Sequence, residues 1–197
     1  MELKNGIPTF YAKNQQAWRN WLLKNHATAK SVWLIIYKKE TGVPSVYYPE
    51  AVDEALCFGW IDSKPNKRND ESYYQFFAKR NPKSNWSKVN KEKIARLIKA
   101  KKMHASGMAM VKLAKETGTW NALNDVDKMQ VPADMQALFN KNKIAFENWQ
   151  AFSKSSRRGI LEWVLQAKRP ETRQKRIEET VALATKNIKA NQFIKKP

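Results

Sequence analysis

Two short stretches of this chain combine charged side chains with tryptophan in a way that could hold a ligand. The first is Cys57-Phe58-Gly59-Trp60-Ile61-Asp62-Ser63, in which Asp62 stands among bulky apolar residues. Burial there would raise the pKa of Asp62, and a guanidinium such as that of Arg80 would lower it. An Asp62–Arg80 pair beside Trp60 could orient a small ligand. The simpler alternative is that Asp62 only holds a hairpin turn in place, because a perturbed acid does not always mark a functional site.

The second stretch runs from Arg80 to Asn90 and combines a turn set by proline with the start of a helix at Ser87. Backbone N–H groups at a helix start, together with nearby lysines, can hold a phosphate or a carboxylate. The simpler alternative is that Ser87 caps the helix and Trp86 fills the core. From the two stretches we predict a ligand pocket formed by Trp60, Asp62, Arg80, Trp86 and Asn90.

Positive charge is concentrated between residues 79 and 115, which carry twelve lysines and arginines and a single carboxylate, Glu92. This segment therefore supplies +11 of the net charge of +19. A local cationic surface attracts an anionic partner, such as a nucleic acid or an acidic protein. The candidate anion-binding residues are Lys83, Lys88, Lys91, Arg96, Lys99 and Lys102.

Contacts of this basic segment with a nucleic acid would be made to phosphates and would be non-specific and strongly salt-dependent. The aromatic residues between Tyr73 and Phe77 could stack on bases. The simpler alternative is a solvated helix face, with most of the aromatic side chains packed in the core.

The residues that usually carry catalysis form no recognisable set in this sequence. The chain has two histidines, His26 and His104, which stand far apart, and one cysteine, Cys57, at the apolar end of a short helix. Neither a hydrolase triad nor a metal site can be assembled from residues at such spacing. The six glycines form no nucleotide-binding loop. We therefore predict no catalytic residue, no metal site and no cofactor.

Composition favours a folded protein that stays in the cytoplasm. Hydrophobic residues make up 42% of the 197 residues, which is enough for a substantial core. A single cysteine cannot form an intramolecular disulfide. The N-terminal segment Met1 to Phe10 lacks the apolar centre of a signal peptide, and no apolar run approaches the length of a membrane span.

The first part of the chain alternates between helical and strand patterns. We expect a helix capped by Asn14 and another that begins at Pro49. Three strands are predicted, at residues 31–38, 58–64 and 72–79, in a small antiparallel sheet packed with helices. Two further helices are expected to begin at Ser87 and Ser106. Their predicted buried residues are Ile94, Leu97 and Ile98 in the first, and Met110, Leu113 and Ala114 in the second.

The remainder of the chain is helical in pattern, with helices expected to begin at Pro132, Ser156 and Pro170 and another around Trp149. The predicted fold class is therefore α+β: a sheet of about three strands with helices, followed by an all-α unit. The predicted domains are residues 1–118 and 119–197, and the tail after Lys189 is expected to be loose.

Three segments resemble the YdeI/OmpD-associated family, also called bacteriocin-protection proteins. The first runs from Glu54 to Ser63, and the second comprises Arg80 and residues 83–90. The third is Ala167-Lys168-Arg169-Pro170-Glu171-Thr172-Arg173, with Arg176-Ile177 after it. The three segments occur in the expected order, and the resemblance extends over nearly the whole chain.

The resemblance implies a bacterial protein linked to tolerance of bacteriocins or cationic antimicrobial peptides, with no settled biochemical activity. It therefore favours a non-enzymatic binding or stress-response module. The alternatives are a non-specific nucleic-acid-binding protein, and a small-ligand enzyme or sensor with a pocket near Asp62 and Arg80. A net charge of +19 should repel a cationic peptide. Protection would then act through an anionic partner or through regulation.

Overall fold

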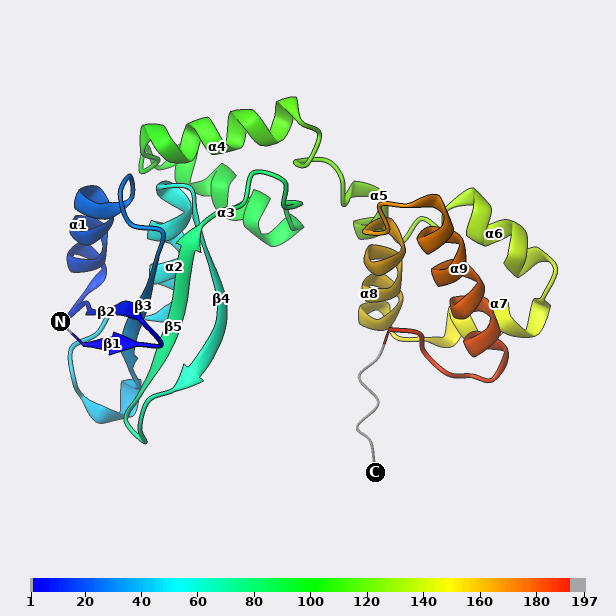
Figure 1. Ribbon diagram of the computed structural model, residues 1–197, viewed down its shortest axis with the longest axis horizontal. Coiled ribbons are helices and arrows are strands. Elements are labelled where there is room, and N and C mark those ends of the chain that lie inside the picture. The colour runs from blue at the N-terminus through cyan, green and yellow to red at the C-terminus, as the bar shows by residue number, and fades with distance from the viewer. Residues whose placement is uncertain (1, 192–197) are drawn as a thin grey trace. The chain divides into compact units, whose positions relative to one another are not determined.

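The computed structural model describes residues 2–191, which divide into two compact units between Asn121 and Ala122. The first unit contains a sheet with helices, and the second contains helices only (Figure 1). This arrangement confirms the α+β class. Within the described residues, no helix combines the length and the apolar composition that crossing a bilayer requires.

The sheet has five strands rather than the predicted three. They are β1 (Leu3–Lys4), β2 (Ile7–Tyr11), β3 (Ser31–Tyr37), β4 (Trp60–Lys67) and β5 (Ser72–Lys79), in the order β1-β2-β3-β5-β4. The β2 and β3 strands are parallel, whereas β5 runs antiparallel to both β3 and β4. The prediction of a small, wholly antiparallel sheet was therefore wrong in strand number and in one pairing.

The two strands that the sequence did not predict form a hairpin at the N-terminus. Asn5 and Gly6 connect them and both have positive φ, at 51° and 74°. Two such residues in succession favour the turn that joins tightly paired strands. The Asn-Gly pair was therefore a signal for this hairpin, although β1 itself is too short to show an alternating pattern.

Helices α1 (Gln15–Asn25) and α2 (Tyr48–Cys57) pack on one face of the sheet. The side chains of Val32, Leu34 and Ile36 alternate along β3 toward these helices, since successive residues of a strand point to opposite faces. Asn14 caps α1, as predicted, by accepting a hydrogen bond from Ala17 N at 2.8 Å. A 3-10 helix, η1 (Lys39–Thr41), follows β3.

Helices α3 (Lys88–Lys99) and α4 (Ala105–Glu116) complete the first unit. Ser87 caps α3 as predicted, and Ile94 and Leu97 are buried. Ile98 was predicted to be buried but is 42% exposed. The cap of α4 is His104 and not Ser106. Ala114 is buried as predicted, whereas Met110 and Leu113 are only half-buried and Val111 is buried instead.

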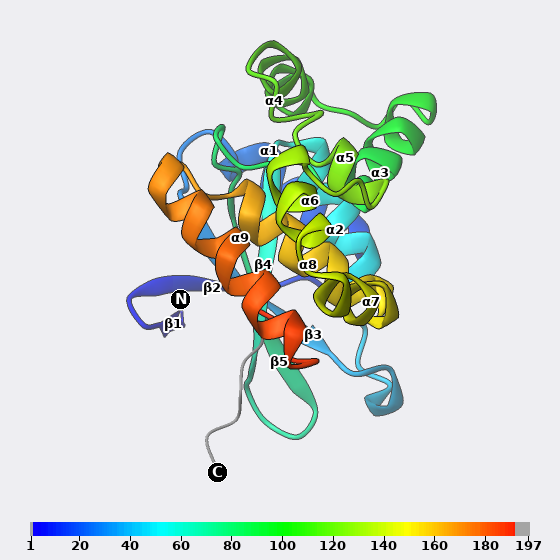
Figure 2. The same ribbon diagram turned by 90° about the vertical axis from the view of Figure 1, so that its right-hand side faces the viewer.

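The second unit consists of α5 (Asn124–Asp127), α6 (Ala133–Asn140), α7 (Lys143–Ala151), α8 (Lys154–Leu165) and α9 (Pro170–Thr185). In Figure 2, α9 crosses the front of this unit. Its core is formed by inward-facing residues of all five helices, among them Val126, Phe139, Trp149, Ile160 and Ile177.

The sequence predicted most of the helices of this unit but not every end. Pro170 begins α9 as expected, whereas α8 is capped by Ser153 rather than beginning at Ser156. The four-residue helix α5 was not predicted. The loose tail expected after Lys189 lies mostly outside the described residues, and the described Ala190 is buried in the core.

At Gly107, α4 lies close to the end of α2. A Cβ atom at this position would lie 2.1 Å from the carbonyl oxygen of Cys57. Since this neighbour is backbone, the Gly107→Ala variant should force the two helices apart. We expect a loss of about 1–3 kcal/mol in the free energy of unfolding, measured by denaturant titration.

Gly159→Ala is the matched control, because Gly159 lies within α8 and a Cβ there would meet nothing within 4 Å. This variant should gain roughly 0.5–1 kcal/mol, since alanine is the better helix former. Equal stability of the Gly107→Ala variant and the unmodified protein would contradict the close approach.

Candidate functional site

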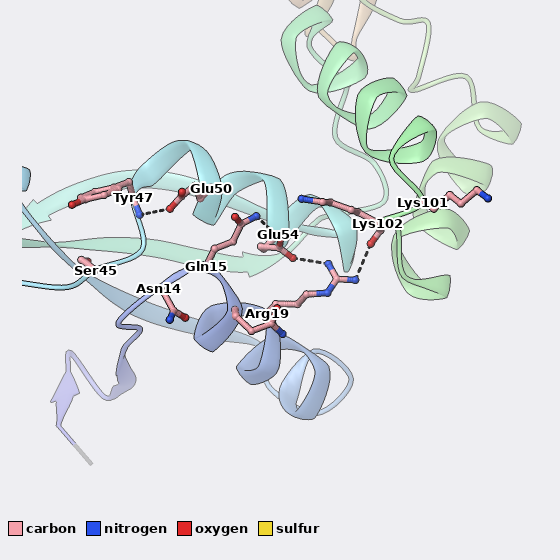
Figure 3. A pocket seen from close by; sticks show the side chains of 10 residues that line it. Asn14, Gln15, Arg19, Ser45, Tyr47, Glu50, Glu54, Lys101 and Lys102 are labelled. Atoms are coloured by element: carbon pink, nitrogen blue, oxygen red, sulfur yellow. Dashed lines mark hydrogen bonds and ion pairs between the residues drawn. The ribbon is translucent and has the colours of Figure 1, made fainter.

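An open pocket of about 580 Å³ lies between α1, α2 and the loop that joins α3 to α4 (Figure 3). Its lining is polar and carries both signs of charge. The residues are Asn14, Gln15, Gln16, Arg19, Ser45, Tyr47, Glu50, Glu54, Lys101 and Lys102. The sequence had predicted only Lys102 among these as a binding residue.

The buried carboxylate of Glu54 organises this pocket. Only 3% of its side chain is exposed, and both of its oxygens accept hydrogen bonds at 2.6 Å, from Gln15 Nε2 and from Arg19 Nη1. Arg19 also donates from Nη2 to the carbonyl oxygen of Lys102 at 2.9 Å. The paired charges offset the cost of burying the carboxylate, and they tie α1, α2 and the α3–α4 loop together (Figure 3).

Electrostatics keep Arg19 charged. Burial lowers the pKa of Arg19, but hydrogen bonding and attraction to Glu54 outweigh that effect, so that the net shift of the Arg19 pKa is upward. A carboxylate held by two donors, one of them a permanent cation, is poorly suited to abstract a proton from a substrate. Glu54 therefore serves better as a fixed charge that shapes the pocket than as a general base.

Other polar groups of the lining are also used by the fold. The carboxylate of Glu50 accepts a hydrogen bond from Tyr47 N at 3.1 Å and thereby caps the N-terminus of α2. The side chains of Lys101 and Lys102 are exposed, and no carboxylate of residues 2–191 lies within ion-pair distance of either ammonium. They are the groups of this pocket that remain able to bind an anion.

The two histidines, widely separated in sequence, lie together next to this pocket. The rings of His26 and His104 are 4.7 Å apart, and Phe58 stacks on His104 at 4.8 Å. Nδ1 of His104 accepts a hydrogen bond from Ser106 N at 3.2 Å, which requires the neutral ring. Sequence spacing gave no signal for this pair.

Cys57 is not poised for nucleophilic chemistry. It is fully buried, and burial, with a smaller contribution from Glu54, raises the pKa of its thiol to about 11. The thiol is therefore protonated at neutral pH, and the thiolate is the reactive form. Within residues 2–191, no three His, Cys, Asp or Glu side chains are arranged to hold a metal ion.

Trp60 and Arg80 are neighbours across the β4–β5 ladder, since Trp60 pairs with Lys79 and Arg80 N donates to the carbonyl oxygen of Gly59 at 3.0 Å. The side chains of the predicted pocket residues, however, have different partners. Trp60 is buried and donates from Nε1 to the carbonyl oxygen of His26 at 3.4 Å. Asp62 accepts a hydrogen bond from the hydroxyl of Tyr48 at 2.6 Å. The structure thus binds Asp62 to α2 and forms no Asp62–Arg80 ion pair within the described part of the chain.

Arg80, Trp86 and Asn90 surround the start of α3. The guanidinium of Arg80 lies 3.9 Å over the Trp86 ring and donates to the carbonyl oxygen of Asn85 at 2.6 Å. Burial lowers the pKa of Arg80 to about 10. Asn90 donates its backbone N–H to Ser87 Oγ. These contacts hold the loop before α3 in place.

The predicted anion-binding residues differ in how far they are neutralised. Arg96 pairs with Asp53 at 2.7 Å, and Lys93 shares the same carboxylate. Lys88 lies 3.9 Å from Glu92. The side chains of Lys83, Lys99 and Lys102 are exposed, and Lys91 is half-buried. Asp53 belongs to α2, so the sequence of the basic segment alone did not reveal this neutralisation.

Comparison with known proteins gave two family matches. Residues 10–110 match a family described as a domain of unknown function (DUF8412). Residues 128–187 match the family described as bacteriocin-protection, YdeI or OmpD-associated, which confirms the predicted resemblance for that part of the chain. No curated protein and no solved structure matches the chain.

The neutral ring of His104 makes stability depend on pH. Burial, together with the charges of His26 and Arg19 that face it, lowers the pKa of His104 below its usual value of about 6.5. Stability from the neutral ring is complete above the unfolded-state pKa and is lost as pH falls through the folded-state pKa. We expect the free energy of unfolding to decline between about pH 7 and pH 5.

The His104→Asn variant tests this origin, because asparagine caps helices well but does not titrate. Its denaturation midpoint should change less over this pH range than that of the unmodified protein. Identical pH profiles for the two proteins would exclude His104 as the source.

Proposed function

The chain belongs to the family of the domain of unknown function DUF8412, and from this and its bacteriocin-protection match we propose a binding module that serves bacteriocin tolerance. In this proposal the module holds an anionic partner and carries out no covalent chemistry of its own. A role in the bacterial stress response fits the same proposal.

The observation that carries the proposal is a set of three exposed lysines at the C-terminal end of α3. Lys99, Lys101 and Lys102 have no carboxylate within ion-pair distance among residues 2–191. Lys101 and Lys102 also line the pocket that Glu54 and Arg19 shape. In Figure 3 the side chains of Lys101 and Lys102 point in different directions, so an extended anionic partner suits these cations better than a single small anion.

The state of the neighbouring cations supports the choice of this place. Asp53 neutralises Lys93 and Arg96, and Glu92 lies close to Lys88. An exposed cation that already has an acidic neighbour offers less to an incoming anion. The end of α3 is therefore the part of the basic segment whose charge is most available.

Net charge decides between two ways in which such a module could protect a cell. A chain with a charge of +19 repels a cationic bacteriocin or antimicrobial peptide at long range. Direct capture of such a peptide is therefore unfavourable. An anionic cellular partner, which the same charge attracts, is the better candidate.

A binding role also fits the state of the groups that usually perform catalysis. Both oxygens of Glu54 accept hydrogen bonds, the pKa of Cys57 is raised to about 11, and His104 caps a helix. Glu54 and His104 have structural partners and the Cys57 thiol is buried and protonated, which supports a structural use of these groups rather than a use in turnover.

The test replaces Lys99, Lys101 and Lys102 together by glutamine. Fluorescently labelled DNA, RNA and polyglutamate are titrated at about 50 mM and about 200 mM salt. We expect the variant to lose roughly tenfold in affinity at low salt for the probe that binds. For a nucleic acid, the slope of log affinity against log salt should fall by about one for each lysine that contacts a phosphate.

A second triple variant, with Lys13, Lys24 and Lys30 changed to glutamine, is the matched control. These lysines are exposed and belong to the same unit, so the change in net charge is identical. If the two triple variants had equal affinities, the loss of binding would follow from net charge alone, which would contradict a local site. Absence of binding to all three probes at low salt would also contradict the proposal.

A further inference from the structure

A second pocket of about 580 Å³ lies on the hairpin of β4 and β5, and it shares no residue with the first. The hairpin continues past the first turn of α2 (Figure 1), so its far end is not covered by that helix. The ladder shifts register between Asp62 and Pro65, where a bulge interrupts the pairing. The lining residues are Tyr48, Ser63, Pro65, Asn66, Lys67, Tyr73 and Gln75.

A buried amide in this pocket has an unused acceptor. Only 2% of Gln75 is exposed, and its Nε2 donates to the carbonyl oxygen of Ser63 in the bulge. Its Oε1 accepts no hydrogen bond from residues 2–191. Oε1 is not among the fully buried polar atoms of the described chain that lack a partner, so it is accessible from the pocket. A ligand that presents an N–H group to it would form this hydrogen bond and shield it from water.

Aromatic rings form much of the remaining lining. The hydroxyl of Tyr48 donates to Asp62 Oδ2 at 2.6 Å, which holds this exposed ring in place. Burial and the bond to Asp62 raise the pKa of Tyr48 to about 12, and burial raises the pKa of Tyr73, so both rings are neutral near pH 7. Neutral aromatic faces favour stacking with another planar ring.

The two tyrosines also line an adjoining pocket of about 640 Å³, together with Lys38, Lys39 and Glu50. The surface around the rings therefore extends beyond one small cavity. Within the hairpin pocket, the lining cation is Lys67, which pairs with Asp70 at 2.8 Å. The pocket itself thus offers stacking and a hydrogen-bond acceptor more than it offers free charge.

We propose that the hairpin pocket binds a planar nitrogen heterocycle of the nucleobase type. The ring stacks on Tyr48 and Tyr73, and one of its N–H groups donates to Gln75 Oε1. This site differs from the anion site at the end of α3, because it recognises an uncharged ring. The same ring could arrive as a free nucleoside or as a base within a single strand, and the two sources present the same chemistry to the pocket.

The test titrates the ¹⁵N-labelled full-length chain with adenine, cytosine, guanosine and uridine and follows backbone amide shifts. We expect saturable shifts at residues 63–67 and 73–75 for at least one of them, with a dissociation constant of about 1 mM or tighter. Because the ring is uncharged, its affinity for the hairpin pocket should change little as the salt concentration rises. Binding of an anion at the end of α3 should weaken over the same range. No saturable shift in this hairpin for any of the four would overturn the proposal.

Matched ligands test the hydrogen bond to Gln75. The base that binds best is compared with a counterpart whose N–H groups are all methylated, such as 6-dimethylamino-9-methylpurine against 9-methyladenine, or 3-methyluridine against uridine. Loss of the N–H donor should weaken binding about tenfold, since the acceptor stays unpaired. Equal affinity of the methylated and unmethylated bases would overturn the proposed orientation.

Matched variants test the stacking. Tyr48→Leu removes the ring and should weaken binding about tenfold, whereas Tyr48→Phe keeps the ring and should change affinity by less than about threefold. Tyr48 is 43% exposed, so both variants should fold. Unchanged binding by the Tyr48→Leu variant would overturn the site.

A short single strand of the preferred base distinguishes the two sources of the ring. Tighter binding of the strand than of the nucleoside, with added shifts at Lys38 and Lys39, supports a single strand as the ligand. Equal binding of the two supports a free nucleoside.

Discussion

The ion pair between Glu54 and Arg19 is the interaction on which the first unit depends most. Glu54 is buried on α2, Arg19 comes from α1, and the same guanidinium holds the carbonyl oxygen of Lys102 after α3 (Figure 3). A buried carboxylate tolerates little displacement of its cation, because separating the charges is costly in a poorly solvated place. The relative positions of these three elements are therefore coupled, and so is the shape of the pocket that they enclose.

Some cations of the first unit are held in ion pairs by the fold, whereas others are exposed to solvent and available to a partner. Asp53, one position before Glu54 in sequence, neutralises two cations of α3 in the same way. The acidic side chains of α2 thus compensate the helix side of the basic segment, while the lysines beyond the end of α3 stay exposed to solvent. A net charge counted along the sequence overstates the charge that a partner meets, since several cations are already balanced by residues distant in the chain.

The sequence predicted what local patterns determine. The caps Asn14 and Ser87 and the proline at the start of α9 follow from the chemistry of helix ends, and each is confirmed. The predicted cap of α4 was wrong. Ser106 matches the usual preference for serine at a helix start, but the structure uses His104, two positions earlier. The His26–His104 contact and the Gln75 amide depend on packing between distant segments, which no local pattern encodes.

The buried position of Cys57 has a consequence for following the protein in solution. It is the only thiol of the chain, and in the native state it is shielded and protonated. An alkylating reagent can reach it only when α2 separates from its neighbours. The rate at which Cys57 is alkylated therefore measures transient opening of the first unit only. The second unit contributes no thiol to this signal, so no label has to be introduced by mutation.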